Sequence, residues 1–141
     1  MIEDFINLVC YTDFSSKNIM ESNGWVFHWN DVYVFRPGGQ YCDDVPSASY
    51  CGFRGQGDGK ISYKFSSSGT GTLSYGSGWE HGSVNVYMND KELESKTTGG
   101  TSNLTIIYSP GDVLKIVEVG QAILIIHSLC ISSAPSSGIY N

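Results

Sequence analysis

Aromatic rings and hydrogen-bonding groups occur together in two glycine-rich stretches of the sequence. Trp79 and His81 stand between Gly76 and Gly82, in a segment with the composition of a turn. The second stretch runs from residue 41 to residue 58 and contains Tyr41, Tyr50, Arg54 and Asp58. Small-ligand sites commonly combine one or two rings with a few polar groups. We therefore expect these six side chains to bind a ligand.

The aromatic residues also have a second interpretation, in which their rings close the hydrophobic core beneath long loops. This interpretation fits Trp25 and Trp29 best, because their even spacing places both rings on one face of a strand. It fits Trp79 less well, since turns run over the surface of a domain. Both interpretations stay open at the level of the sequence.

Known catalytic motifs do not match the chain. The glycine-rich run from residue 52 to residue 60 lacks phosphate-loop spacing, because Arg54 replaces the first glycine and Ile61 replaces Ser or Thr. Neither a nucleophile elbow nor a Cys–His signature is present. Nucleotide binding is therefore not expected, and we expect a binding domain without enzymatic activity.

Metal-ligating residues are sparse. Asp43 and Asp44, with Asp58, offer the hard oxygen ligands that calcium prefers, but no segment matches an EF-hand loop. We keep Asp43 and Asp44 as candidate ligands for Ca²⁺ and favour solvated loop carboxylates as the alternative. The three histidines, His28, His81 and His127, stand far apart in the sequence.

The sequence contains four cysteines, which permit three pairings. Cys42 and Cys51 flank a short segment that a disulfide can close locally, whereas Cys10 and Cys130 lie in the first and last strand-like segments. We therefore predict disulfides Cys10–Cys130 and Cys42–Cys51, with four free thiols of a cytosolic protein as the alternative. Disulfides are typical of oxidising compartments, so we expect an extracellular or secreted protein. Because residues 1–10 do not read as a signal peptide, that expectation requires a leader that was removed.

The charge balance argues against two classes of partner. The net charge is −6 and only eight residues are Lys or Arg, whereas affinity for nucleic acid depends on cations that neutralise phosphates. The longest apolar run, residues 122–126, is far shorter than the ~20 residues that span a bilayer. We expect neither nucleic-acid binding nor membrane insertion.

Alternation of apolar and polar residues predicts an all-β domain. It is clearest in residues 61–65, 84–88 and 113–118, and Asn89-Asp90 is a hairpin signal. Ser109-Pro110-Gly111-Asp112 has the composition of a type II turn. Eight to ten short strands of this kind predict an antiparallel β-sandwich over residues 1–132, followed by a Ser/Pro-rich tail over residues 133–141. Residues 36–59 are expected to form a long loop, and residues 16–21 a short helical turn.

Residues 60–132 resemble the galactose-binding-like jelly rolls found in many carbohydrate-binding modules and secreted lectins. The resemblance rests on residues 71–76 with 83–90, on the aromatic–turn–Gly-Asp–apolar element at residues 108–116, and on the closing strand at residues 122–131. It implies a jelly-roll fold, a sugar bound by rim loops against an exposed ring, and often a calcium ion that braces early loops. The sequence lacks the clear acidic cluster that such an ion would need.

The resemblance gives the candidate site a specific chemistry. The rings would stack on the C–H face of a pyranose, while Arg54, Asp58 and His81 would bind its hydroxyls. A glycan or glycoprotein is then the expected partner, and oligomerisation would add avidity. An extracellular structural or protein-interaction module is the alternative, and a small hydrolase would need facing carboxylates such as Asp58 and Glu80. Asn103-Leu104-Thr105 is a glycosylation sequon, in keeping with secretion.

Overall fold

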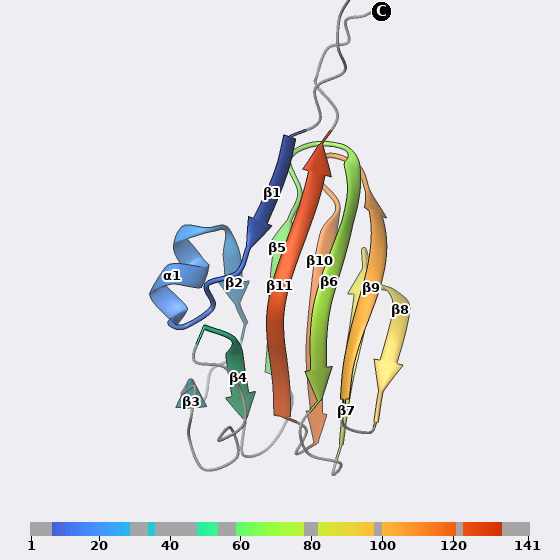
Figure 1. The fold of residues 1–141 in the computed structure, drawn as a ribbon. Coiled ribbons are helices and arrows are strands. Elements are labelled where there is room, and N and C mark those ends of the chain that lie inside the picture. The colour runs from blue at the N-terminus through green and yellow to red at the C-terminus, as the bar shows by residue number, and fades with distance from the viewer. Residues whose placement is uncertain are drawn as a thin grey trace, which may run out of the picture.

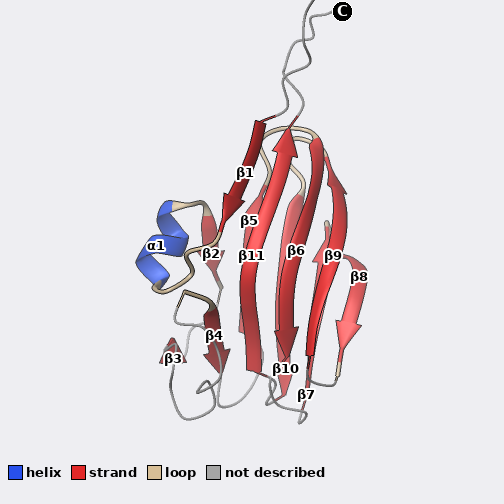
Figure 2. Ribbon diagram, viewed as in Figure 1, coloured by secondary structure: helices blue, strands red, loops and turns tan. Residues whose placement is uncertain are grey.

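Two antiparallel sheets lie face to face in the computed structural model of the chain (Figure 1). The structure describes residues 7–28, 34–35, 48–53, 59–77, 82–97, 100–120 and 123–133. Strands make up most of these residues, and the short helix α1 (Lys17–Ser22) lies at one side of the sandwich (Figure 2). No helix in these ranges is long and apolar enough to cross a membrane.

The first sheet, sheet A, has the strand order β3-β4-β11-β6-β9, and β1 also pairs with β11. Its strands are β1 (Asn7–Tyr11), β3 (Val34–Phe35), β4 (Tyr50–Phe53), β6 (Gly69–Ser77), β9 (Gly100–Tyr108) and β11 (Ile123–Ser133). The second sheet, sheet B, has the order β2-β5-β10-β7-β8. Its strands are β2 (Trp25–Phe27), β5 (Gly59–Lys64), β7 (Gly82–Met88), β8 (Lys91–Lys96) and β10 (Val113–Gly120).

The predicted all-β sandwich is confirmed, with one strand that the sequence did not indicate. β4 lies in the stretch expected to be a long loop, and it raises the number of described strands to eleven. Residues 134–141 of the expected tail lie outside the described residues, and β11 continues to Ser133.

The local signals identified in the sequence form the expected turns. Asn89 and Asp90 have φ values of 52° and 70°, the left-handed backbone that a two-residue type I′ hairpin requires. Gly111 has φ 91°, and the Asp112 amide donates to the Ser109 carbonyl at 3.0 Å, as in a type II turn. At the start of α1, the Ser16 hydroxyl accepts from the Ile19 amide at 3.1 Å and caps the helix.

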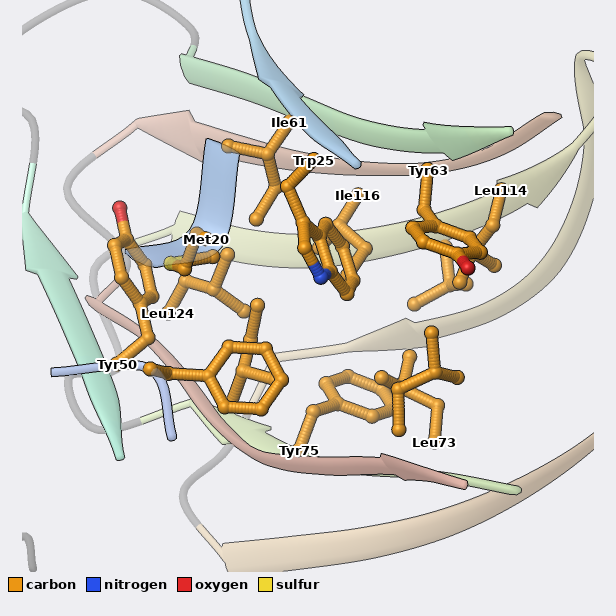
Figure 3. Packing of buried hydrophobic residues seen from close by; sticks show 14 of the residues in the cluster. Met20, Trp25, Tyr50, Ile61, Tyr63, Leu73, Tyr75, Leu114, Ile116 and Leu124 are labelled. Atoms are coloured by element: carbon orange, nitrogen blue, oxygen red, sulfur yellow. The ribbon is translucent and has the colours of Figure 1, made fainter. Parts of the chain in front are cut away.

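Side chains from both sheets fill the space between them (Figure 3). A continuous row of rings crosses this core, with centroid separations of 5.8 Å, 5.4 Å, 5.1 Å and 3.9 Å along the series Phe14, Trp25, Tyr63, Phe65 and Tyr108. The last pair stacks a residue that follows β5 in sheet B onto a residue of β9 in sheet A. Aromatic contacts of this kind add to the apolar area that the core buries.

The predicted disulfide Cys10–Cys130 is confirmed, and it joins facing residues of β1 and β11. Cys51 is also disulfide-bonded. Its predicted partner, Cys42, lies outside the described residues. None of the described cysteines is a free thiol.

Replacing Cys10 and Cys130 together by serine should lower the free energy of unfolding by up to about 4–5 kcal/mol. The bridge joins residues 120 positions apart, so it restricts a long loop in the unfolded chain. Urea denaturation under non-reducing conditions measures the change, and Leu8→Ala, at an exposed position of the same strand, is the control. An unchanged denaturation midpoint in the double variant would contradict the prediction.

Candidate functional site

Several strands begin or end together at one end of the sandwich, which we call the Ser77 end. Phe53 of β4 pairs with Ile123 at the start of β11, and Ser77 at the end of β6 pairs with both Leu124 and Gly100. In sheet B, Gly59 pairs with Glu118, and Gly82 pairs with Gly120. In Figure 1 these strand ends lie at the bottom.

Most of the side chains expected to bind a ligand lie outside the described residues: Trp79, His81, Tyr41, Arg54 and Asp58, together with the candidate metal ligands Asp43 and Asp44. Trp29 lies outside them as well. The structure nevertheless describes the residues that flank four of these side chains in the sequence. Phe53 and Gly59 flank Arg54 and Asp58, whereas Ser77 and Gly82 flank Trp79 and His81. All four flanking residues belong to the Ser77 end.

Tyr50 is the exception, because the structure describes it fully. Its side chain is 0% exposed and belongs to the hydrophobic core (Figure 3). Its ring lies 6.4 Å from that of Phe27. Trp25 is also buried, between Phe14 and Tyr63. The core interpretation therefore holds for Trp25, and Tyr50 contributes to packing in this structure.

A groove of about 540 Å³ lies on sheet B, at residues that the sequence pattern did not single out. It is lined by residues of β5 and β10, by β2 with the residue after it, and by the β7–β8 turn: Val26, His28, Ser62, Lys64, Asn89, Asp90, Val113 and Lys115. The strand register explains the grouping, since Val26 pairs with Ser62 and Ser62 pairs with Lys115. Paired residues of adjacent strands point to the same face of a sheet.

Hydrogen bonds hold the polar side chains of the groove in position. His28 Nε2 and Ser62 Oγ are hydrogen-bonded at 2.8 Å, and Lys115 Nζ contacts Asp90 Oδ1 at 2.7 Å. The side-chain amide nitrogen of Asn89, Nδ2, donates to Asp112 Oδ1 at 2.8 Å. The side-chain oxygen of Asn89, Oδ1, accepts from the Val113 backbone N–H at 2.9 Å. The turn that carries Asp90 is thereby fixed to the start of β10.

The face of the groove is richer in cations than the chain as a whole. Lys60, Ser62 and Lys64 alternate along β5, so both lysines share the face of Ser62 and Lys115. Asp90 supplies a carboxylate at the edge, and the Lys115 ammonium lowers the pKa of that carboxyl through their hydrogen bond and charge. Such a surface suits a ligand that offers hydroxyl or anionic oxygen atoms, with Val26 and Val113 as apolar contacts.

Two serine–histidine contacts occur in the described part of the chain, one between His28 and Ser62 and one between Ser49 Oγ and His127 Nδ1 at 2.8 Å. In the ranges that the structure describes, neither imidazole is hydrogen-bonded to a carboxylate, the third group of a catalytic triad. Those ranges also contain no group of three or more His, Cys, Asp or Glu residues that could hold a metal ion.

Replacing Lys115 by methionine should raise the pKa of Asp90 toward its ordinary value of 3.8. The Lys115 ammonium favours the charged form of the Asp90 carboxylate. The ion pair therefore contributes to the free energy of unfolding at pH values above the ordinary pKa, and this contribution is lost as the pH falls through the lowered pKa of Asp90. Carboxyl-detected NMR titration measures the shift, with Lys64→Met as a matched control in the same groove. Equal Asp90 pKa values in the wild type and Lys115→Met would contradict the assignment.

Comparison with known proteins identifies the fold. No family model matches the sequence, and no curated protein matches it. Among solved structures, a family 35 carbohydrate binding module from Clostridium thermocellum is similar at 14% identity, with a TM-score of 0.51 over 89% of this chain and 97% of that one. A CBM35 from Paenibacillus barcinonensis is similar at 16% identity, with a TM-score of 0.50 over 92% and 99%.

A family two carbohydrate esterase from Cellvibrio japonicus is also similar, at 10% identity and a TM-score of 0.50. The match covers 93% of this chain but only 34% of the esterase chain, whereas the two modules are covered almost completely. At these identities the likeness concerns the fold. The chain therefore has a jelly-roll fold like that of carbohydrate-binding modules.

Proposed function

We propose that this domain is a non-catalytic module that binds carbohydrate. The observation that carries the proposal is the similarity of fold between most of this chain and nearly complete carbohydrate-binding modules. One fold hosts many functions, so the proposal also needs a surface with suitable chemistry. The Ser77 end and the groove on sheet B are the two surfaces that offer it.

We place the principal sugar site at the Ser77 end. The residues proposed to form it are Trp79, His81, Tyr41, Arg54 and Asp58, and the buried Tyr50 supports the core below. The rings would stack on the apolar face of a pyranose, and the guanidinium, carboxylate and imidazole would hydrogen-bond its hydroxyls. Loops on a rigid sheet scaffold commonly carry binding residues, because they vary without disturbing the core.

The groove on sheet B is the second surface. It offers His28, Lys64 and Lys115 as hydrogen-bonding groups beside the apolar Val26 and Val113, but no aromatic ring lines its described walls. A sugar bound there would depend on hydrogen bonds and charge more than on stacking. The groove therefore predicts a preference for anionic sugars, whereas stacking at the Ser77 end does not require ligand charge.

The proposal includes secretion and a structural role for calcium. The Cys10–Cys130 disulfide supports an oxidising compartment, since such bridges are rare in cytosolic proteins. Asp43 and Asp44 are the carboxylates proposed to hold Ca²⁺ if the ion braces the loops. Measuring sugar binding in calcium and after chelation tests that role separately from sugar binding itself.

Trp79→Ala should weaken binding to soluble polysaccharides at least tenfold, because truncation removes the proposed stacking surface. Trp79→Phe should retain part of the affinity, since a smaller ring remains. Affinity electrophoresis against a panel of neutral and acidic polysaccharides, with and without calcium, measures both effects. Lys64→Ala in the groove is the control, and it should bind the neutral polysaccharides of the panel like the wild type.

Two results would change this assignment. If Lys64→Ala loses binding while Trp79→Ala retains it, the sugar site lies in the groove. If the folded wild type binds no polysaccharide or glycan under either calcium condition, the carbohydrate proposal is wrong. The protein-interaction alternative would then take its place.

A further inference from the structure

The edge strands of the two sheets differ in how well they are protected from pairing with another chain. An exposed edge presents unpaired backbone N–H and C=O groups, and proteins commonly shorten, charge or bulge such strands. β3 and β1 lie along one edge of sheet A and have two and five residues, and β2 at one edge of sheet B has three. All three are too short to template a ladder as long as the nine residues of β9.

β8, at the other edge of sheet B, is protected by charge and by a bulge. Four of its six residues are charged: Lys91, Glu92, Glu94 and Lys96. Its pairing with β7 shifts register between Val86 and Tyr87, so Leu93 stands outside the ladder. Two of its side chains turn to sheet A, where Glu94 accepts from the Tyr75 hydroxyl and Lys96 donates to Ser102 Oγ at 3.0 Å.

β9, at the edge of sheet A opposite β3 and β1, has none of these protections. Its nine residues contain no charged side chain and no proline, and they form nine consecutive pairs with β6 without a register shift. Among the described strands, β9 pairs with β6 alone. Ile107 is 78% exposed on this strand. β9 is therefore a long, regular and uncharged strand. It lies at the edge of sheet A, beyond β6 (Figure 2).

We propose that β9 pairs in antiparallel fashion with β9 of a second copy of this chain. A two-fold axis perpendicular to sheet A at Leu104 would join the two sheets A into one. Leu104 then faces Leu104 of the second copy, Asn103 faces Thr105, and Thr101 faces Ile107. In this register the even-numbered residues of one β9 face the even-numbered residues of the other. The core-facing side of one sheet A therefore continues the core-facing side of the other, and the exposed sides match in the same way.

The chemistry of the strand favours its own copy as the partner. Thr101, Asn103, Thr105 and Ile107 are all exposed, and the proposed register pairs each of them with another member of this set. Ile107 gains a β-branched neighbour, Thr101, and Asn103 gains a hydroxyl neighbour, Thr105. Since β9 contains no charged residue, this strand pairing buries no charge despite a net charge of −6 on each chain.

Thr105→Lys tests the interface. It would place two ammonium groups diagonally across the two-fold axis, and like charges between paired strands are unfavourable. Thr72→Lys is the matched control, because Thr72 is exposed on β6 directly beside Thr105 but lies one strand in from the edge. Ile107→Lys provides a second edge variant if Thr105→Lys fails to fold.

Sedimentation velocity over a concentration series, with protein made in bacteria so that Asn103 carries no glycan, is the measurement. We expect the wild type and Thr72→Lys to reach twice the mass of one chain, and the edge variants to dimerise at least tenfold more weakly. Hydrogen exchange of the β9 amides should slow with rising concentration in the wild type and in Thr72→Lys, but not in the two edge variants. A wild type that stays monomeric to millimolar concentration, or folded edge variants that dimerise like Thr72→Lys, would overturn the proposal.

Discussion

The fold depends on the pairing of β11, which joins segments from the whole length of the chain. One edge of β11 pairs with β6 from Leu124 to Ser133, whereas the other edge is shared end to end by β4 and β1. The register shift between Ile126 and Ser128 lies where β4 gives way to β1, and there His127 is hydrogen-bonded to Ser49, just before β4. The Cys10–Cys130 bridge then holds β1 to the second half of the strand.

This non-local pairing explains which parts of the fold could be predicted from the sequence. Segments such as residues 61–65 and 84–88 predicted their strands because alternation of apolar and polar residues within the segment itself marks the core-facing positions. The Asn89-Asp90 turn was predicted for the same reason, since its left-handed backbone suits those two residues. β4 was missed because its four residues stand among Pro and Gly and owe their strand structure to β11. The strand order could not be predicted, since it follows from contacts far apart in the sequence.

The candidate site shows the same limit. Tyr50 was predicted in a loop, but β4 turns its ring into the core, where Phe27 packs against it. The groove on sheet B was missed although Lys60, Ser62 and Lys64 share one face by simple alternation. That face becomes a groove only when β2, β10 and the β7–β8 turn lie beside β5. The binding role of residues outside the described ranges, such as Trp79, stays a prediction. The strands that flank Trp79 in the sequence end at the Ser77 end of the sandwich.

The proposed β9 pairing has different consequences for the two candidate sugar surfaces. Antiparallel strands run in opposite directions, so the Ser77 ends of the two copies would point away from each other. Sites there would join two separate glycan chains. Rotation about an axis perpendicular to the sheets keeps both sheet B faces on the same side, so two grooves would face one surface together. Avidity arises only when both sites can engage at once. A dimer of this geometry would therefore strengthen binding to one polysaccharide surface through the grooves, and would cross-link polymers through the Ser77 ends.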